Sequence, residues 1–276
     1  MSVAAQRGRK LVGTGWKMNH GIADTLAYID LLRERLAGIN HHGLDVFVLP
    51  PFTALSAAGA RVAGSEIGVG AQNVHWDDRG AWTGEVSAPM LVEAGCRYVA
   101  LAHSERLQHF NETYAAVRLK VNAALRHGLT PILCLGETAE DKRDGRADEV
   151  LADQLATAMA DQPAEFLPRL VLAYEPRWAI GAAAAADPAY VTDRLAQLRA
   201  ALGGRYGAAN ATATRILYGG SVTAANAPEL AAIPDVDGLF VGRYAWNADG
   251  LAEIVAIVAE AANAASTQNG TEELST

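Results

Sequence analysis

Side chains that could carry chemistry follow three short apolar runs of the sequence. Lys17 comes after a run that ends in two glycines, His103 lies two residues before Glu105, and Glu175 directly follows a third run. Lys17 offers an ammonium group that could neutralise an anionic substrate, and Glu175 is a candidate base. Each group also has a simpler interpretation, because surface lysines and structural histidines are common. The residues therefore point to catalysis only if the fold brings them together.

Glycine-rich turns follow two later apolar runs. They read Tyr218-Gly219-Gly220-Ser221 and Val241-Gly242-Arg243. Glycine lets backbone N–H groups close on a bound anion, and in barrels the loops after the seventh and eighth strands commonly bind phosphate. The two turns are therefore candidate phosphate sites, although a Gly-Gly-Ser turn alone is weak evidence.

Composition narrows the class of protein. The chain has 276 residues, of which 50% are hydrophobic and 20% charged, as in soluble globular proteins. A net charge of -8 at pH 7 argues against nucleic acid or an anionic membrane surface as a partner. No apolar run reaches membrane-spanning length, and the two cysteines, Cys96 and Cys134, fit a reducing compartment. We therefore expect a cytoplasmic protein.

Short β-rich runs alternate with longer helical patterns along the chain. Apolar residues at intervals of three and four, such as Val191, Leu195, Leu198 and Leu202, predict one-sided helices. Eight such pairs in about 250 residues match a closed (β/α)8 barrel, an α/β fold of one domain, with a doubly wound open sheet as the alternative. The predicted strands are Lys10–Gly13, Asp45–Leu49, Ile67–Ala71, Tyr98–Leu101, Thr130–Leu135, Leu170–Tyr174, Arg215–Tyr218 and Gly238–Val241.

The domain organisation follows from the same pattern. We assign residues 1–265 to the barrel, because no linker rich in Pro, Gly or Ser divides them. Residues 266–276 are polar and lose the apolar spacing of the preceding helix, so we expect a disordered tail. In a barrel, loops at the carboxyl ends of the strands build the active site, so Lys17, His103 and Glu175 should meet at one mouth together with both glycine turns.

Several motifs in this chain resemble those of the triosephosphate isomerase family, in order and over nearly the whole length. The resemblance implies that Glu175 is the base that moves a proton beside a carbonyl, and that a neutral His103 polarises that carbonyl. Lys17 would add positive charge, with Glu105 placed to pair with it. The matching motifs are Gly15-Trp16-Lys17-Met18-Asn19, Ala71-Gln72-Asn73, Thr83-Gly84-Glu85, His103-Ser104-Glu105-Arg106, Cys134-Leu135-Gly136-Glu137, Tyr174-Glu175-Pro176, Trp178-Ala179-Ile180-Gly181 and Tyr218-Gly219-Gly220-Ser221.

The same resemblance implies how a phosphorylated ketose would be held. Residues 178–183 would form a lid, and the N–H of Gly181 would bind the phosphate together with Ser221 and the turn at Gly242. Tyr218 would latch the lid. Lid closure keeps water from an enediolate phosphate, which otherwise tends to eliminate its phosphate.

The resemblance also implies a partner. The loop from Gln72 to Glu85 would pair two chains into a homodimer, with Thr83 reaching toward the neighbour's site. No cofactor is implied. The seven histidines, including His41 and His42, show no metal-ligand spacing, so no metal is expected either.

The chain departs from the family at positions around the substrate. Gly15 stands where the family has asparagine, Ala102 where it has glycine, and Arg243 where the phosphate turn has a second glycine. The segment Ala182–Ala186 replaces a Thr-Gly-Lys-like segment of the lid. Losing the asparagine side chain deletes a polar contact and opens space. Arg243 can still offer its backbone N–H if its φ is not required to be positive, and its guanidinium could contact phosphate.

These changes favour a relative tuned to a larger ketose phosphate. L-Erythrulose 1-phosphate is dihydroxyacetone phosphate with one more hydroxymethyl group, and moving its carbonyl yields D-erythrulose 4-phosphate. The chain is similar to the tetrulose-phosphate isomerase branch of the family, which is associated with erythritol breakdown, at Gly15 and at the turn with Arg243. The alternatives are a triosephosphate isomerase of glycolysis and a non-catalytic phosphate-binding barrel. A glycosidase using Glu105 and Glu175 would leave the glycine turns unexplained.

Overall fold

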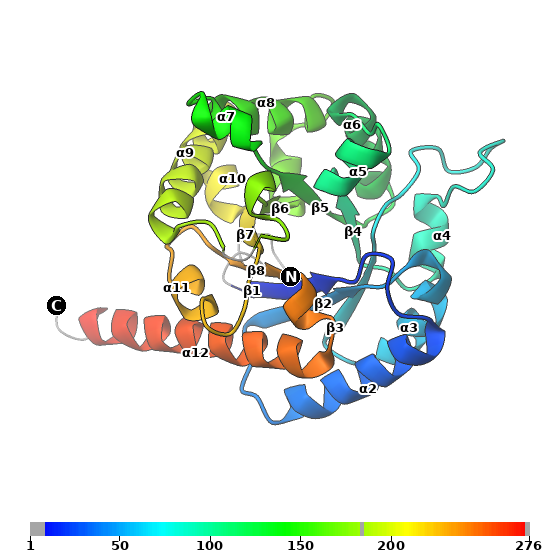
Figure 1. Ribbon diagram of the computed structural model, residues 1–276, viewed down its shortest axis with the longest axis horizontal. Coiled ribbons are helices and arrows are strands. Elements are labelled where there is room, and N and C mark those ends of the chain that lie inside the picture. Colours follow the sequence, from blue (N-terminus) through cyan, green and yellow to red (C-terminus); the bar gives the residue numbers. More distant parts are fainter. Residues whose placement is uncertain (1–8, 183–184, 274–276) are drawn as a thin grey trace.

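Eight parallel strands form a closed ring in this computed structural model, which describes residues 9–182 and 185–273 (Figure 1). The strands pair in chain order, and β8 pairs with β1 through Leu11 opposite Gly238 and Thr14 opposite Val241. This pairing closes the sheet and confirms the barrel over the doubly wound alternative. The strands are β1 (Lys10–Gly15), β2 (Leu44–Leu49), β3 (Ile67–Ala71), β4 (Tyr98–Leu101), β5 (Thr130–Leu135), β6 (Val171–Tyr174), β7 (Arg215–Gly220) and β8 (Gly238–Val241).

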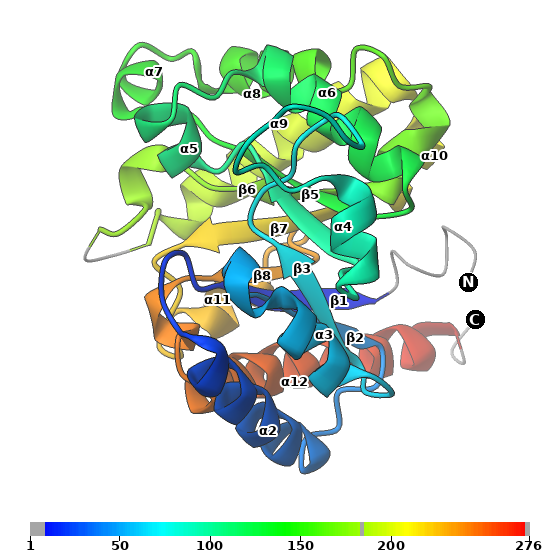
Figure 2. The same ribbon diagram turned by 90° about the vertical axis from the view of Figure 1, so that its right-hand side faces the viewer.

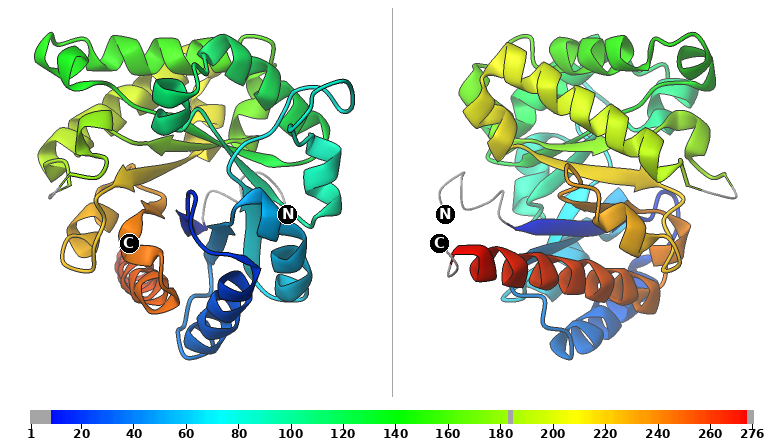
Figure 3. Two further views of the ribbon diagram at one scale, coloured as in Figure 1. Left: turned by 45° about the vertical axis from the view of Figure 1, so that its right-hand side comes forward. Right: turned by 90° about the vertical axis from the view of Figure 1, so that its left-hand side faces the viewer.

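Helices surround the strands on the outside of the barrel (Figure 2; Figure 3). The α-helices are α2 (Ile22–Ala37), α3 (Leu55–Val62), α4 (Ala88–Glu93), α5 (Ser104–His109), α6 (Tyr114–Arg126), α7 (Ala139–Arg143), α8 (Ala147–Ala158), α9 (Pro188–Tyr206), α10 (Ala208–Ala213), α11 (Ala227–Ala231) and α12 (Ala248–Glu273). Short 3₁₀ helices are η1 (Phe52–Ala54), η2 (Ala164–Arg169), η3 (Arg177–Ala179) and η4 (Arg243–Ala245). None of the helices in these two described ranges is both long and apolar enough to cross a membrane.

Two strands run further than their side chains indicate. The sequence predicts that the first strand ends at Gly13 and the seventh at Tyr218, whereas β1 continues to Gly15 and β7 to Gly220. Glycine carries no apolar side chain to signal a strand, but its backbone still pairs with the neighbouring strand. Gly15 lies opposite Leu49 in the ladder, and Gly220 lies opposite Val241.

The apolar core has two layers, one on each face of the sheet, because successive side chains of a strand point to opposite faces. The larger layer fills the space between the strands and the helices. The smaller one fills the barrel interior and contains three aromatic rings, from Phe47, Tyr98 and Phe240. The rings of Phe47 and Phe240 lie 5.6 Å apart between centroids. Glycines on the interior face make room for these rings, since a Cβ added to Gly13 would lie 2.3 Å from Cδ1 of Phe47.

The last helix is longer than expected. Helix α12 runs to Glu273, whereas the sequence indicates a disordered tail from residue 266. The helical backbone continues because, once a helix is nucleated, each added residue gains one hydrogen bond at little further cost. Residues 274–276 lie outside the described part of the chain.

The interior packing predicts that alanine substitution destabilises the protein at Gly13 of β1 but not at Gly15. Gly13→Ala should lower the free energy of unfolding by about 1–3 kcal/mol, because its methyl group would overlap a core ring. Gly15→Ala should change it by less than about 0.5 kcal/mol, since the nearest atom to the added Cβ is 3.5 Å away. Urea unfolding of both variants measures the difference, and an equal loss in both would contradict this view of the interior.

Candidate active site

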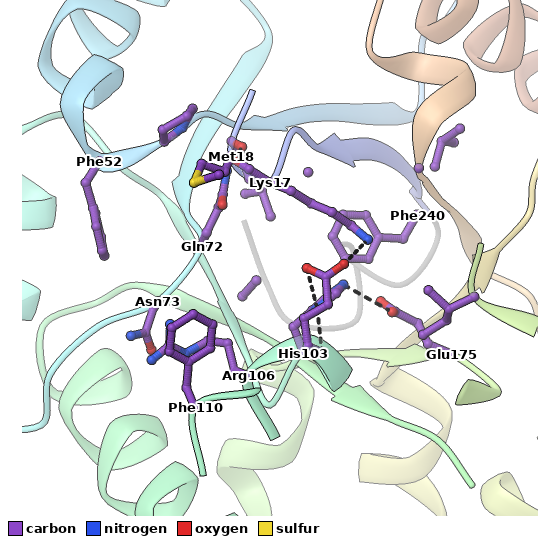
Figure 4. A pocket seen from close by; sticks show the side chains of 18 of the residues that line it. Lys17, Met18, Phe52, Gln72, Asn73, His103, Arg106, Phe110, Glu175 and Phe240 are labelled. Atoms are coloured by element: carbon purple, nitrogen blue, oxygen red, sulfur yellow. Dashed lines mark hydrogen bonds and ion pairs between the residues drawn. The ribbon is translucent and has the colours of Figure 1, made fainter. Parts of the chain in front are cut away.

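The polar residues that follow the strands converge at one mouth of the barrel. Residues that the sequence assigns to the site line one cavity of about 470 Å³ there, namely Gly15, Lys17, His103, Glu105, Glu175 and Gly242. Figure 4 shows Lys17, His103 and Glu175 around this cavity. These lining residues lie at or just after the ends of β1, β4, β6 and β8, which are far apart in sequence. The closed sheet brings them together because the carboxyl ends of all eight parallel strands lie on the same side.

Lys17 has a strained backbone that its neighbours hold in place. Its φ is +53°, a left-handed conformation that costs energy for a residue with a side chain. The side-chain amide of Gln72 donates to the carbonyl oxygens of both Lys17 and Leu49, each at 2.9 Å. The Lys17 Nζ lies 2.5 Å from Oε1 of Glu105, so the ammonium is fixed at the cavity by an ion pair.

The His103 imidazole is oriented by the start of helix α5. Its Nδ1 accepts a hydrogen bond of 3.2 Å from the backbone N–H of Glu105. A nitrogen that accepts a hydrogen bond carries no hydrogen, so in this geometry Nε2 is the ring nitrogen that carries one. His103 can therefore donate a hydrogen bond from Nε2 into the cavity.

Glu175 is a buried carboxylate, with its side chain only 7% exposed. Two of its neighbours, Gly219 on β7 and Gly136 directly after β5, must be glycines. A Cβ at Gly219 would lie 2.5 Å from Cγ of Glu175, and one at Gly136 would lie 1.9 Å from its backbone oxygen. The Cys134 thiol donates to Oε1 at 3.5 Å. Burial and the nearby Glu175 charge raise the pKa of Cys134 well above its usual value, so the thiol stays protonated as a donor.

Lys17, His103 and Glu175 line the same cavity, and His103 and Glu175 are not hydrogen-bonded to each other. Nε2 of His103 and Oε2 of Glu175 are 3.8 Å apart, longer than a hydrogen bond. A carboxylate base, a neutral N–H donor and an ammonium group around one cavity can together move a proton at a carbon next to a carbonyl and stabilise the resulting enediolate. No cluster of three metal-ligating side chains occurs among the residues that the structure describes.

A second cavity of about 860 Å³ adjoins the first and shares Lys17, Glu105, Ile180, Gly220 and Gly242 with it. It is lined by the other residues that the sequence assigns to phosphate, Gly181, Ser221 and Arg243. Gly242 precedes η4, and neither it nor Arg243 is among the described residues with positive φ. Arg243 thus adopts this turn without backbone strain, which keeps its N–H usable as an anion donor.

Comparisons with known proteins agree on one family. A family model described as triosephosphate isomerase matches residues 10–258. The L-erythrulose-1-phosphate isomerase of Rhizobium rhizogenes is 42% identical over 252 residues, covering 90% of this chain and 94% of the relative. The triosephosphate isomerase of Chloroflexus aurantiacus is 43% identical over 246 residues, covering 89% and 97%. A crystal structure of the Bartonella henselae triosephosphate isomerase has a TM-score of 0.81 at 34% identity, covering 90% of this chain and 98% of that one.

The chain belongs to the triosephosphate isomerase family. It is therefore an isomerase, and the resemblance seen in its motifs is confirmed. The relatives at about equal identity carry two names that differ in substrate, so overall similarity does not choose between a triose phosphate and a tetrulose phosphate.

The segment that the sequence predicts to form a lid is hydrogen-bonded to β7 and to the turn that follows it. Oγ of Ser221 donates to the carbonyl oxygens of Ala179 at 3.2 Å and Ala182 at 2.7 Å. The Tyr218 hydroxyl, which is buried, accepts from the N–H of Ala186 at 3.0 Å. Residues 183 and 184 of the expected lid lie outside the described part of the chain.

Arg243 has a contact that family motifs do not suggest. Its Nη2 lies 3.4 Å from the carbonyl oxygen of Gly181, across the second cavity. The side chain therefore extends toward the expected lid segment. Glu137, which we expect to act in hydrogen bonding near the site, accepts from the Trp178 indole at 2.7 Å and the Tyr190 hydroxyl at 2.9 Å, and so ties the start of that segment to α9.

Thr83 lies away from both cavities of its own chain. It is exposed in the long loop between β3 and α4, which projects from the body of the barrel (Figure 1). In that loop the rings of His75 and Trp76 stack at 4.2 Å, and the Trp82 ring lies 4.6 Å from His75. These contacts give the projecting loop its own small core.

Phe240 is a cavity residue that the sequence analysis does not identify. It lies on β8 two residues before Gly242, and its ring lines the same cavity as Glu175 and His103 (Figure 4). Residues two apart along a strand share a face, so the choice of Gly242 as a site residue also indicates Phe240. Its apolar side chain gave no reason to consider it.

Replacing Ala102, the residue before His103, with glycine is expected to stabilise the protein. Ala102 has a φ of +60°, where an L side chain is strained. Ala102→Gly should raise the free energy of unfolding by about 1 kcal/mol, the relief of that strain less the greater unfolded-state entropy of glycine. The control Ala115→Gly, at an exposed position of α6, should lower it by about 1 kcal/mol. Urea unfolding measures both, and a loss at Ala102 would contradict the expectation.

Proposed function

We propose that this isomerase converts L-erythrulose 1-phosphate to D-erythrulose 4-phosphate, a step of erythritol breakdown. The observation that carries this proposal is Gly15, which lines the cavity beside the reacting groups although neither packing nor φ requires glycine there. The space in front of it suits the extra hydroxymethyl group of a four-carbon substrate. A relative with this name is 42% identical over 90% of the chain, and one from Mycolicibacterium smegmatis is 43% identical over the same share.

The reaction needs only a proton shift between the two central carbons. Glu175 removes the proton from the hydroxyl-bearing carbon C3, and the electrons of that C–H bond form the C2–C3 double bond of an enediolate. His103 donates from Nε2 to the carbonyl oxygen and takes the proton from the neighbouring hydroxyl. Glu175 then returns its proton to C2, which leaves the ketone at C3. Lys17 stabilises the negative charge on oxygen.

The phosphate would occupy the second cavity. Backbone N–H groups of Gly181 and Gly242 and the Arg243 guanidinium would donate to it, and Lys17 adds charge where the two cavities meet. Ser221 lines the same cavity and holds the lid segment through its hydroxyl. The Ser221 and Tyr218 contacts hold the lid segment over this place, which excludes water from the enediolate.

The main alternative substrate is dihydroxyacetone phosphate, converted to glyceraldehyde 3-phosphate. The same base, imidazole and ammonium would serve it, and the Chloroflexus aurantiacus relative with that name is 43% identical. Gly15 would then have no use, because the smaller substrate lacks the carbon that reaches it. A non-catalytic phosphate-binding barrel would retain the second cavity but has no need of the buried carboxylate Glu175.

We further propose a cytoplasmic homodimer. The projecting loop from Gln72 to Glu85 contains Trp82, which is 48% exposed, and Met18, which lines the first cavity, is 95% exposed. Contiguous exposed apolar surface marks a protein interface, and the family resemblance implies that this loop pairs two chains. Cys96 and Cys134 are both buried and unpaired, which agrees with a reducing compartment.

The substrate is tested by NMR-followed turnover of L-erythrulose 1-phosphate and dihydroxyacetone phosphate side by side. We expect a higher kcat/KM for the four-carbon compound. Glu175→Ala should lower turnover of both by about 10²–10⁴-fold, because the base is lost, and it serves as the control for contaminating isomerases. Faster turnover of the triose would make this a glycolytic enzyme. Unchanged turnover in Glu175→Ala would remove the carboxylate from the mechanism.

The dimer is tested by light scattering after size-exclusion chromatography. Wild type should give twice the 29.0 kDa mass of one chain. Trp82→Glu should give one chain, because a buried unpaired charge at an interface costs several kcal/mol. The control Ala201→Glu places the same charge at an exposed position of α9, on the opposite side of the barrel from the loop (Figure 1), and should stay dimeric. A Trp82→Glu protein that still runs as a dimer would place the interface elsewhere.

A further inference from the structure

Two glycines of β1 lie on the inward face of the strand, but only one of them is required by packing. Leu11, Gly13 and Gly15 share the inward face, because side chains alternate along a strand. A Cβ at Gly13 would lie within 2.4 Å of three ring atoms of Phe47, so packing demands glycine there. A Cβ at Gly15 would meet only ordinary contacts, and its φ is not positive. The absence of a side chain at Gly15 thus leaves a recess that the fold does not need.

The walls of this recess are apolar and well defined. The atoms nearest the missing Cβ are Cζ and Cε2 of Phe240, at 3.5 and 3.6 Å, and Cδ1 of Leu49, at 3.8 Å. Gly15, Phe240 and Leu49 all line the cavity that Glu175 and His103 also line. The carbonyl oxygen of Gly15 already accepts a hydrogen bond from the Trp246 indole at 3.2 Å. What the recess presents to a ligand is therefore carbon surface.

The position of the Phe240 ring is fixed by its own packing. Phe240 lies opposite Gly13 in the pairing of β1 with β8, and its side chain is only 8% exposed. The ring of Phe47 supports it from inside the barrel. Because Gly13 leaves room for Phe47 and Phe47 supports Phe240, the edge of the Phe240 ring is held beside Gly15 and cannot move deeper into the interior.

We propose that Phe240 is a specificity-determining residue, whose ring edge and the bare backbone of Gly15 form the two walls that receive the fourth carbon of the substrate. This inference rests on the proposed function and names the residue that sets the width of its subsite. A side chain at position 15 narrows the recess, and a shorter side chain at position 240 widens it. The two positions therefore compensate each other in volume.

The geometry offers a direct test of compensation. Gly15→Ala places a methyl group in the recess, while Phe240→Leu removes Cζ and Cε2, the two atoms nearest that methyl group. We would measure kcat/KM for L-erythrulose 1-phosphate and for dihydroxyacetone phosphate in wild type, both single variants and the double variant. The readout is the ratio of the two values, which a loss of stability alone does not change. Thermal unfolding checks that each variant is folded at the assay temperature.

We expect the four-carbon to three-carbon ratio to fall about tenfold or more in Gly15→Ala, the cost of one misplaced methyl group in a pocket. Phe240→Leu alone should lower the ratio about threefold, because the fourth carbon loses ring contacts. The double variant should recover to within about threefold of wild type, since the leucine makes room for the methyl group. Phe166→Leu, the same change in η2 outside the cavity, should leave the ratio unchanged.

Failure of this inference can be told from failure of the proposed function. A double variant whose ratio falls by the product of the two single effects would overturn the role of Phe240, whichever substrate wild type prefers. A wild-type preference for the triose together with recovery in the double variant would overturn the proposed function and keep the recess. A wild type without activity on the four-carbon compound would overturn both.

Discussion

The pairing of β8 with β1 is the constraint on which the rest of this structure depends. It turns a sheet with two edges into a ring, so that all eight carboxyl ends surround one mouth. It also sets Phe240 opposite Gly13, and this register carries the ring to the level of Gly15. A shift of the register by one residue would turn Phe240 outward and remove one wall of the cavity.

The ionisable groups at the mouth are held in position by their neighbours. The Lys17 ammonium is fixed by Glu105, and the His103 ring accepts an N–H that only its neutral form can accept. Cys134, kept protonated by burial, donates to Glu175. The fold itself supplies these partners, so little reorganisation would be needed when charge develops on a substrate oxygen.

The departures from the family separate chemistry from substrate size. Lys17, His103 and Glu175 line one cavity, as the motifs imply, while Gly15 and Arg243 differ from the family in the first and the second cavity. A barrel tolerates such changes because side chains at its strand ends can vary without altering the strands that position them. Gly15 leaves space beside Phe240 and Leu49 in the first cavity, and Arg243 extends across the second cavity toward Gly181.

The sequence by itself determined the barrel and the approximate strands, and it placed Lys17, His103 and Glu175 at strand ends, because apolar runs and motif spacing are local properties of the chain. It missed the strand ends at Gly15 and Gly220, whose pairing leaves no side-chain signal, and the helical backbone of α12 beyond residue 265. Only the tertiary structure decided that Gly13 is required by packing and Gly15 is not, and that Phe240 lines the cavity. Those facts depend on which atoms from distant strands come within contact distance, and closure of the ring sets those distances.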